Sequence, residues 1–135
     1  MILSIEHLGL AVSDAGKALS TFEKLLGKPS YKTEEVASEK VKTHFFRLGE
    51  SQIELLESID PEGVISKFIE RKGQGMHHVA LRVDDIFYEM GRLKNLGFEF
   101  INPEPKKGAD NKLICFLHPK TTEGVLVELC QEITY

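Results

Sequence analysis

Tryptophan is absent from this 135-residue chain, and cysteine occurs only twice, as Cys115 and Cys130. Two cysteines do not make the disulfide framework of a small secreted protein, so we expect both to stay reduced. No apolar run approaches the roughly 20 residues that a membrane-spanning helix needs. Met1 leads directly into an apolar segment, without the basic start of a secretory signal. The sequence therefore predicts a single domain, 1–135, located in the cytoplasm.

Positive charge is also scarce, because 17 Lys and Arg residues face 21 Asp and Glu residues and leave a net charge of −4. A protein of this charge has no overall basic field for nucleic acid, and we expect neither a nucleic acid nor a membrane partner. An anionic ligand would need a local basic patch. The chain also lacks any Ser-His-Asp or Cys-His arrangement typical of nucleophilic catalysis.

The chain does contain an internal repeat. The segment EHLGLAVSD, residues 6–14, is matched by HHVALRVDD, residues 77–85. In this alignment His7 falls on His78, and the leucine, valine and final aspartate of the two segments also coincide. Of the two neighbouring histidines, His78 is therefore the repeated one and His77 is the additional one.

Each repeated segment predicts a strand followed by a helix. Asp14 and Asp85 stand where helix N-caps are expected, and each following apolar pattern ends at a Leu-Gly pair, with Gly27 and Gly97 as expected C-caps. Two further strand-like runs follow in each half. The sequence thus predicts the order β-α-β-β-β twice, with a linking helix between the halves.

Alternation along the strands places the repeated histidines beside small residues, with branched residues on the opposite face where a helix would pack. Glu54 and Glu128 recur in the same way, each between apolar residues that point to the other face. Two carboxylates on the face of a sheet need a compensating partner, which a divalent metal supplies. Two imidazoles with two carboxylates suit a first-row divalent ion that keeps positions open for water or substrate.

A single strand histidine or glutamate is more often packed or solvated than metal-bound. The four residues His7, Glu54, His78 and Glu128 form two symmetric pairs, however, and this symmetry favours a shared metal site. Neither cysteine has zinc-finger spacing, and neither is needed for this site.

These residues resemble the vicinal-oxygen-chelate superfamily, whose members include glyoxalases, extradiol dioxygenases and antibiotic-resistance proteins. The resemblance covers nearly the whole chain. Three stretches are most similar to the methylmalonyl-coenzyme A epimerases of that superfamily: SKFIERKGQGMHHVALRVDDI, LGESQIELLE and KLICFLHPKTTEGVLVEL. The double histidine after Gly-Met, and FLHPK followed by GVLVEL, are the most specific of these features.

The resemblance implies an α+β fold. Two paired βαβββ modules, at about residues 2–58 and 75–131, form a curved mixed sheet around one metal cleft, with helices on the outer face and the linking helix at about residues 60–73. It implies one divalent ion per chain, held by His7, Glu54, His78 and Glu128. Cobalt is the first expectation, and manganese, nickel and zinc also accept this ligand set. Relatives of this kind are often homodimers, so we expect one here.

The implied reaction interconverts (2R)- and (2S)-methylmalonyl-coenzyme A by removing and returning the proton at C2. The family assigns one acid/base role to the position of Glu128. For the second, some epimerases have a glutamate where this chain has Thr43, so Glu54 is the symmetric alternative and His44 a third candidate. Coenzyme A also carries phosphates, which need positively charged contacts. The candidates are Lys106, Lys107, Lys112 and Lys120, and the alternative is that these lysines are simply solvated.

Two other functions compete with this interpretation. A glyoxalase-type lactoylglutathione lyase would use the same metal and similar chemistry on a thiohemiacetal. A non-catalytic resistance protein that sequesters a ligand would have no need of the four ligands, and their presence therefore argues against it.

Overall fold

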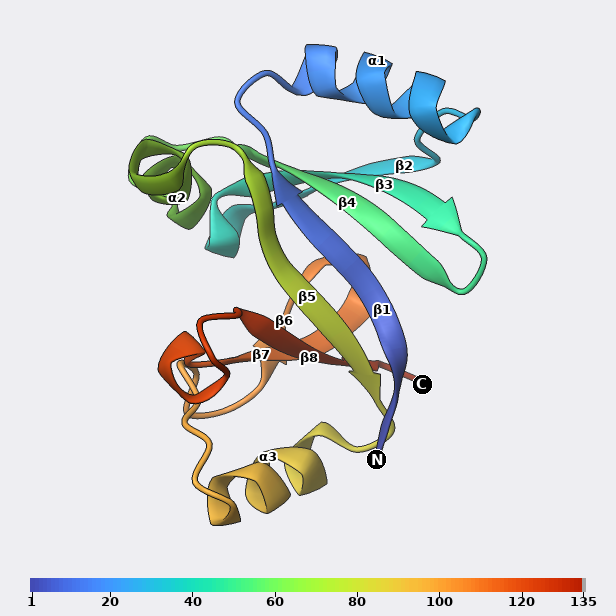
Figure 1. The fold of residues 1–135 in the computed structure, drawn as a ribbon. Helices are drawn as coiled ribbons and strands as arrows, with labels where there is room; N and C mark the ends of the chain where they lie inside the picture. The colour runs from blue at the N-terminus through green and yellow to red at the C-terminus, as the bar shows by residue number, and fades with distance from the viewer. Residues whose placement is uncertain (135) are drawn as a thin grey trace. The chain divides into compact units, whose positions relative to one another are not determined.

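Each half of the chain folds in the predicted order of strand, helix, strand, strand, strand (Figure 1). The computed structural model describes residues 1–134. The first half contains β1 (Ile2–Ala11), α1 (Ala15–Leu26), β2 (Lys32–Val36), β3 (Val41–Leu48) and β4 (Ser51–Ser58). The second half contains β5 (Gly75–Val83), α3 (Ile86–Asn95), β6 (Lys106–Lys107), β7 (Lys112–Leu117) and β8 (Val127–Glu132). The linking helix is α2 (Val64–Lys72), which begins later than the sequence predicts. The 3-10 helices η1 (Ala37–Glu39), η2 (Ala109–Asn111) and η3 (Pro119–Thr121) lie in connections.

The strands form one mixed sheet in the order β2-β3-β4-β1-β5-β8-β7-β6. The pairing of β5 with β8 is parallel, whereas β2 with β3, β3 with β4, β6 with β7 and β7 with β8 are antiparallel. In each half, the last strand of the repeat lies next to the first. The predicted α+β class is therefore confirmed. Among the described residues, no helix combines the length and apolar character required to cross a membrane.

The chain divides into two compact units, each described here by itself. Unit 1 comprises residues 1–7 and the chain from residue 78 onward, and unit 2 comprises residues 8–77. β1 passes from unit 1 to unit 2 after His7, and β5 returns to unit 1 at His78. The division into modules at about 2–58 and 75–131 follows the sequence repeat and stays a prediction.

In unit 2, α1 packs on one face of the strands. The Asp14 side chain accepts a hydrogen bond from the Lys17 N–H at 3.0 Å, which confirms the predicted N-cap. The helix ends at Gly27, whose φ of 73° is the left-handed conformation that glycine adopts at low cost. Between these caps, Leu19 and Phe22 pack in an apolar cluster. Its buried members are Phe46 on β3, Leu55 on β4 and Val12, which directly follows β1.

The same logic positions α3 in unit 1. Asp85 caps the helix by accepting a hydrogen bond from the Tyr88 N–H at 3.0 Å. The C-cap of α3 is Leu96, whereas the C-cap of α1 is the glycine Gly27. Gly97, which the sequence predicts as the cap of α3, follows Leu96 with a φ of 96°. The buried face of α3 contributes Ile86, Met90 and Leu93 to a cluster with strand residues Val83, Cys115, Leu117 and Leu129.

Strand register shows which side chains share a face. In unit 1, Ala80 is paired with Glu128, and Glu128 with Phe116, so these three lie on the face opposite the one that α3 covers. In unit 2, Glu54 is paired with Phe45, whereas its neighbour Leu55 packs toward α1. In each unit the candidate carboxylate thus lies opposite the helix that follows the first strand. α2 packs on the other face of unit 2, in a cluster that includes Ala11, Val41, Leu56 and Ile65.

Candidate metal centre

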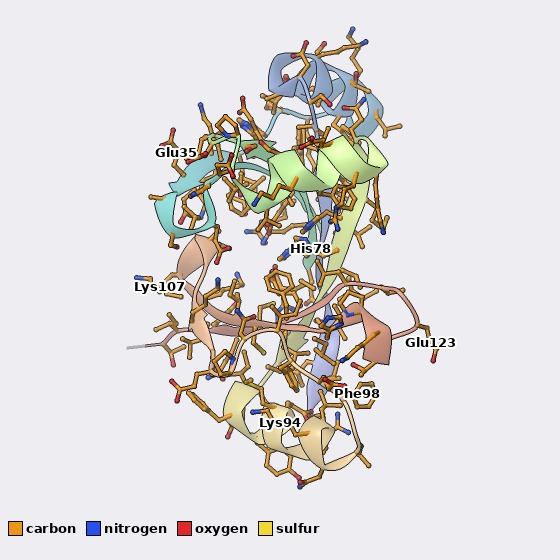
Figure 2. All side chains as sticks on the ribbon, turned by 90° about the vertical axis from the view of Figure 1, so that its left-hand side faces the viewer. Glu35, His78, Lys94, Phe98, Lys107 and Glu123 are labelled. Atoms are coloured by element: carbon orange, nitrogen blue, oxygen red, sulfur yellow. The ribbon has the colours of Figure 1, made fainter. Side chains whose placement is uncertain are left out.

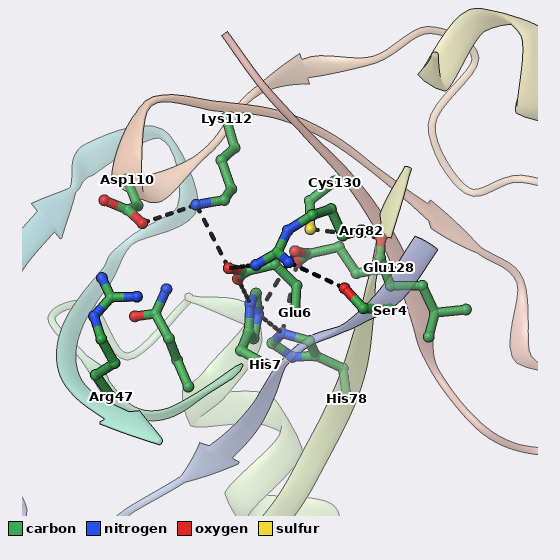
Figure 3. Close-up of polar contacts among 12 residues, drawn as sticks. Ser4, Glu6, His7, Arg47, His78, Arg82, Asp110, Lys112, Glu128 and Cys130 are labelled. Atoms are coloured by element: carbon green, nitrogen blue, oxygen red, sulfur yellow. Dashed lines mark hydrogen bonds and ion pairs between the residues drawn. The ribbon is translucent and has the colours of Figure 1, made fainter. Parts of the chain in front are cut away.

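Three of the predicted ligands converge within unit 1 (Figure 3). They are His7 on β1, His78 on β5 and Glu128 on β8, and all three are buried. The Nε2 atoms of His7 and His78 lie 2.9 Å apart. In the Glu128 carboxylate, Oε2 lies 3.6 Å from His7 Nε2, and Oε1 lies 3.5 Å from His78 Nε2. Two imidazole nitrogens and a carboxylate therefore face one another across a small volume.

The spacing of these atoms fits a first-row divalent ion. Nitrogen and oxygen ligands bind such ions at about 2.0–2.2 Å, so neighbouring ligand atoms at octahedral or tetrahedral angles are expected about 2.8–3.6 Å from one another. The separations of 2.9, 3.5 and 3.6 Å agree with this geometry. Imidazole and carboxylate donors are also those that zinc, cobalt, nickel and manganese accept in proteins. The donor set thus fits a metal with further coordination positions open.

Local packing fixes the orientation of the two rings. The His7 and His78 rings meet edge to face, with centroids 5.1 Å apart and an angle of 83° between their planes. On its other side, His78 meets the Phe116 ring edge to face at 5.6 Å. Ala80, two residues after His78 on β5, is fully buried and adds no bulk to this face. The edge-to-face contacts therefore limit the rotation of the rings, and Ala80 leaves space beside His78.

A third carboxylate, Glu6, lies behind the His7 ring. Its Oε1 is 2.6 Å from His7 Nδ1, and its side chain is 2% exposed. Its Oε2 lies 3.4 Å from Arg82 and 3.7 Å from Lys112 Nζ. The sequence argument missed this residue because strict alternation places Glu6 and His7 on opposite faces. The available signal was a charged residue within an apolar strand, directly beside a predicted ligand.

The four predicted coenzyme-binding lysines have different surroundings. Lys112 is buried, and it donates a hydrogen bond to Asp110 at 2.8 Å in addition to facing Glu6. Burial by itself would lower the pKa of Lys112, but the Asp110 hydrogen bond and the Glu6 charge raise this pKa overall. Lys106 and Lys107 are exposed on β6, and the Lys107 side chain points outward in Figure 2. Lys120 is 3.1 Å from Glu99 in an exposed ion pair.

The fourth predicted ligand, Glu54, lies on β4 in unit 2 and is buried. Its place in the same metal site stays a prediction. Thr43 is paired with Leu56 and so lies on the Glu54 face of the strands. His44 lies on the opposite face, where its ring contacts Thr33 at 3.0 Å and Glu57 at 3.1 Å. This arrangement disfavours His44 as a second base acting together with Glu54.

The additional histidine, His77, lies in unit 2 and packs against α2. Its ring meets the Phe68 ring edge to face, with centroids 4.9 Å apart. Burial, followed by the nearby Arg71 charge, lowers the pKa of His77 to about 4. His77 thus has a packing role that accounts for its presence beside His78.

Both cysteines are fully buried and are not joined in a disulfide. Burial, followed by the Glu128 charge, raises the pKa of the Cys115 thiol to about 12. Cys130 lies on the Glu128 face of β8, as alternation predicts, and packs with Ala80 and Ile114. A space-filling role agrees with these surroundings.

Residues 6–116 match the model of the Glyoxalase/Bleomycin resistance protein/Dioxygenase superfamily. The ethylmalonyl-CoA/methylmalonyl-CoA epimerase of Cereibacter sphaeroides is 35% identical over 133 residues, which cover 97% of this chain and 99% of that protein. The mitochondrial methylmalonyl-CoA epimerase of Mus musculus is 36% identical over 128 residues, which cover 94% of this chain and 72% of that protein. A variant of the Streptomyces coelicolor methylmalonyl-CoA epimerase, solved with 2-nitronate-propionyl-CoA, superposes with a TM-score of 0.94 at 26% identity, over 99% of this chain and all of that one.

Proposed function

Because this chain belongs to the glyoxalase/bleomycin resistance protein/dioxygenase superfamily, we propose that it is an epimerase of methylmalonyl-coenzyme A. The observation that carries the proposal is the buried convergence of His7, His78 and Glu128, on a fold shared with epimerases of this substrate. The cluster has the donors of a Lewis-acid site and lacks a nucleophile. Such a site suits proton transfer next to a carbonyl group.

The proposed metal ligands are His7, His78 and Glu128, with Glu54 as the fourth. Cobalt is the first candidate, ahead of manganese, nickel and zinc. When bound, the ion supplies Lewis acidity that makes the C2 proton of a thioester easier to remove. Glu128 is the proposed acid/base on one face of C2, and Glu54 is the proposed acid/base on the other. A carboxylate buried among imidazoles is shielded from bulk water, which favours direct transfer of a proton at C2.

The substrate also requires contacts for its coenzyme A phosphates. Lys106, Lys107 and Lys120 are the proposed contacts, because all three side chains are exposed at the surface. Lys112 keeps this role as a prediction, although its ammonium already faces Asp110 and Glu6. We further propose that the protein acts in the cytoplasm as a homodimer.

The direct test is exchange and epimerisation in heavy water. Purified protein is stripped of metal, reloaded with Co²⁺, and incubated with (2R)-methylmalonyl-coenzyme A while NMR follows deuterium at C2 and chiral analysis follows the (2S) form. Both signals should appear only with metal. A metal-loaded protein that leaves C2 unexchanged but isomerises a glutathione thiohemiacetal would replace this proposal with the lyase alternative.

Glu128→Gln tests the first acid/base assignment. The amide keeps an oxygen donor of similar size but cannot accept the C2 proton. A positioned acid/base contributes about 10²–10⁴-fold to the rate, so turnover should fall by about that factor while part of the metal is retained.

Glu54→Gln tests the second assignment in the same assay. A large loss of epimerisation with C2 exchange retained in one substrate epimer supports one base on each face. Nearly full activity would leave Glu54 as a ligand only and would reject it as a base.

A further inference from the structure

Glu6 is the most completely buried charged residue around the metal centre whose role is not yet accounted for. Its carboxylate is 2% exposed, and each of its oxygens has a defined neighbour in unit 1. Oε1 faces the His7 ring at 2.6 Å, and Oε2 faces Arg82 and Lys112 at 3.4 and 3.7 Å. Burying a carboxylate is costly unless it is paired, so this placement requires all of these partners together.

The contact with His7 determines where the ring proton lies. Arg82 and Lys112 face the far oxygen of Glu6, and a carboxylate only accepts hydrogen bonds. The 2.6 Å contact therefore pairs Glu6 Oε1 with a hydrogen on His7 Nδ1. The lone pair of the ring is then on Nε2, the atom that faces His78 and Glu128. A metal requires this tautomer, because it binds the nitrogen that carries no hydrogen.

We propose that Glu6 is a positioning residue for the metal, holding the His7 ring with Nδ1–H on its carboxylate and the Nε2 lone pair in the metal site. The inference rests on the proposed function only in that His7 is taken as a metal ligand. Carboxylates that hydrogen-bond to metal-binding histidines fix the ring orientation and make the imidazole a stronger ligand. Glu6 itself contributes no atom to the reaction.

Arg82 and Lys112 keep Glu6 in this position. They come from β5 and β7, and Arg82 is also anchored by a hydrogen bond to Ser4 Oγ at 3.0 Å (Figure 3). Lys112 also pairs with Asp110 and so lies between two carboxylates. The Glu6 carboxylate, which is on β1, is therefore contacted by side chains from β5 and β7. The network therefore links the orientation of His7 to strands that are distant in sequence.

Isothermal titration of metal-free protein with Co²⁺ measures the effect directly. Glu6→Gln should raise the Kd for Co²⁺ by about 10–100-fold, the usual loss when the carboxylate behind a metal-binding histidine is removed. The matched control is Glu89→Gln. Glu89 is also a buried glutamate of unit 1 paired with an arginine, but its partners are Arg92 on α3 and the amino group of Met1. The control should leave the Kd for Co²⁺ unchanged in the folded protein.

A second variant separates positioning from folding, because Glu6→Gln leaves the buried Lys112 and the partly buried Arg82 with a weaker partner. In Glu6→Leu/Lys112→Met one charge of each sign is removed and apolar volume is kept, so unfolding should stay cooperative. The Kd for Co²⁺ should still be raised. In ¹⁵N-histidine NMR of metal-free protein at pH 8, wild-type His7 should carry its hydrogen on Nδ1, and the double variant should shift it toward Nε2.

The inference would be overturned by a folded double variant with the wild-type Kd for Co²⁺, or by a wild-type His7 with its hydrogen on Nε2. A wild-type protein that does not bind Co²⁺ would overturn it as well. The outcome is independent of catalysis, because neither measurement uses substrate. Wild-type protein that binds Co²⁺ through an Nδ1–H His7 but does not epimerise would reject the proposed function and leave the role of Glu6 standing.

Discussion

At the scale of single residues, His77 and His78 show how neighbours in a strand acquire different roles. Their side chains leave β5 in opposite directions, so that His78 meets His7 and Glu128 while His77 meets Phe68 on α2. The sequence repeat distinguishes the two histidines, since only His78 has a counterpart in the first half. The packing partner of His77 has no such signal, because Phe68 belongs to the helix outside the repeat.

This difference predicts opposite results for two alanine variants. His78→Ala removes a ring that faces the metal centre and should abolish stoichiometric metal binding. His77→Ala removes a ring whose edge-to-face contact with Phe68 is worth about 0.5–1.5 kcal/mol of folding stability, and it should leave metal binding intact. Metal content after dialysis, measured beside urea unfolding, checks both. Loss of metal in the His77 variant alone would reverse the assignment.

The cysteines give a second prediction for single residues. Because burial raises the pKa of Cys115 to about 12, its thiol stays protonated at pH 8, and Cys130 is equally inaccessible. Thiolates, not thiols, react with alkylating reagents. We expect neither cysteine to react with iodoacetamide in native protein and both to react in guanidinium chloride, as counted by mass spectrometry. Rapid labelling of one cysteine under native conditions would contradict the buried placement.

At the scale of an element, α3 carries a buried carboxylate, that of Glu89, whose charge makes the stability of the folded protein depend on pH. Glu89 accepts a hydrogen bond from Arg92 three residues later, and this contact, followed by one with the amino group of Met1 at 2.9 Å, holds the pKa of Glu89 below its ordinary value of 4.5. A carboxylate with a lower pKa in the folded state binds protons more readily in the unfolded chain. Its stabilisation is therefore present above pH 4.5 and is lost as the pH falls through the folded-state pKa.

Glu89→Gln should accordingly lower the free energy of unfolding at neutral pH. The difference from wild type should shrink as the pH is lowered from 6 to 3, because protonation removes the same charge from the wild-type protein. Urea unfolding followed by circular dichroism across this range measures it. A difference that is constant with pH would show that the loss comes from packing rather than from the carboxylate charge.

The local elements are the part of the structure that the sequence predicts well. Asp14, Asp85 and Gly27 cap helices where the pattern places them, because capping depends on residues within one turn. The start of the linking helix was predicted too early, since the turn before Gly63 is stabilised by backbone contacts that a pattern of apolar residues does not report. The partnership of Glu6 with Lys112 could not be predicted, because it joins strands far apart in sequence.

At the scale of the whole molecule, the strand order implies that the halves depend on each other. β1 lies between β4 and β5, so a fragment ending at Lys72 would leave one side of β1 without a neighbouring strand. A core of that size rarely supplies more than about 3–5 kcal/mol of stability. Fragment 1–72 should therefore lack cooperative thermal unfolding by circular dichroism and dispersed amide signals by NMR. A stably folded fragment would show that the first half is autonomous.

The strand order β2-β3-β4-β1-β5-β8-β7-β6 also has a consequence for ancestry. Because the first strands of the two repeats are neighbours at its centre, two copies of a single βαβββ chain, associated through that strand, would generate the same order. After duplication and fusion of such a gene, the two halves of the chain could diverge in sequence. Glu6 and His77 occupy equivalent places in the repeat but have different surroundings: Glu6 contacts His7 of the candidate metal centre, and His77 packs against α2.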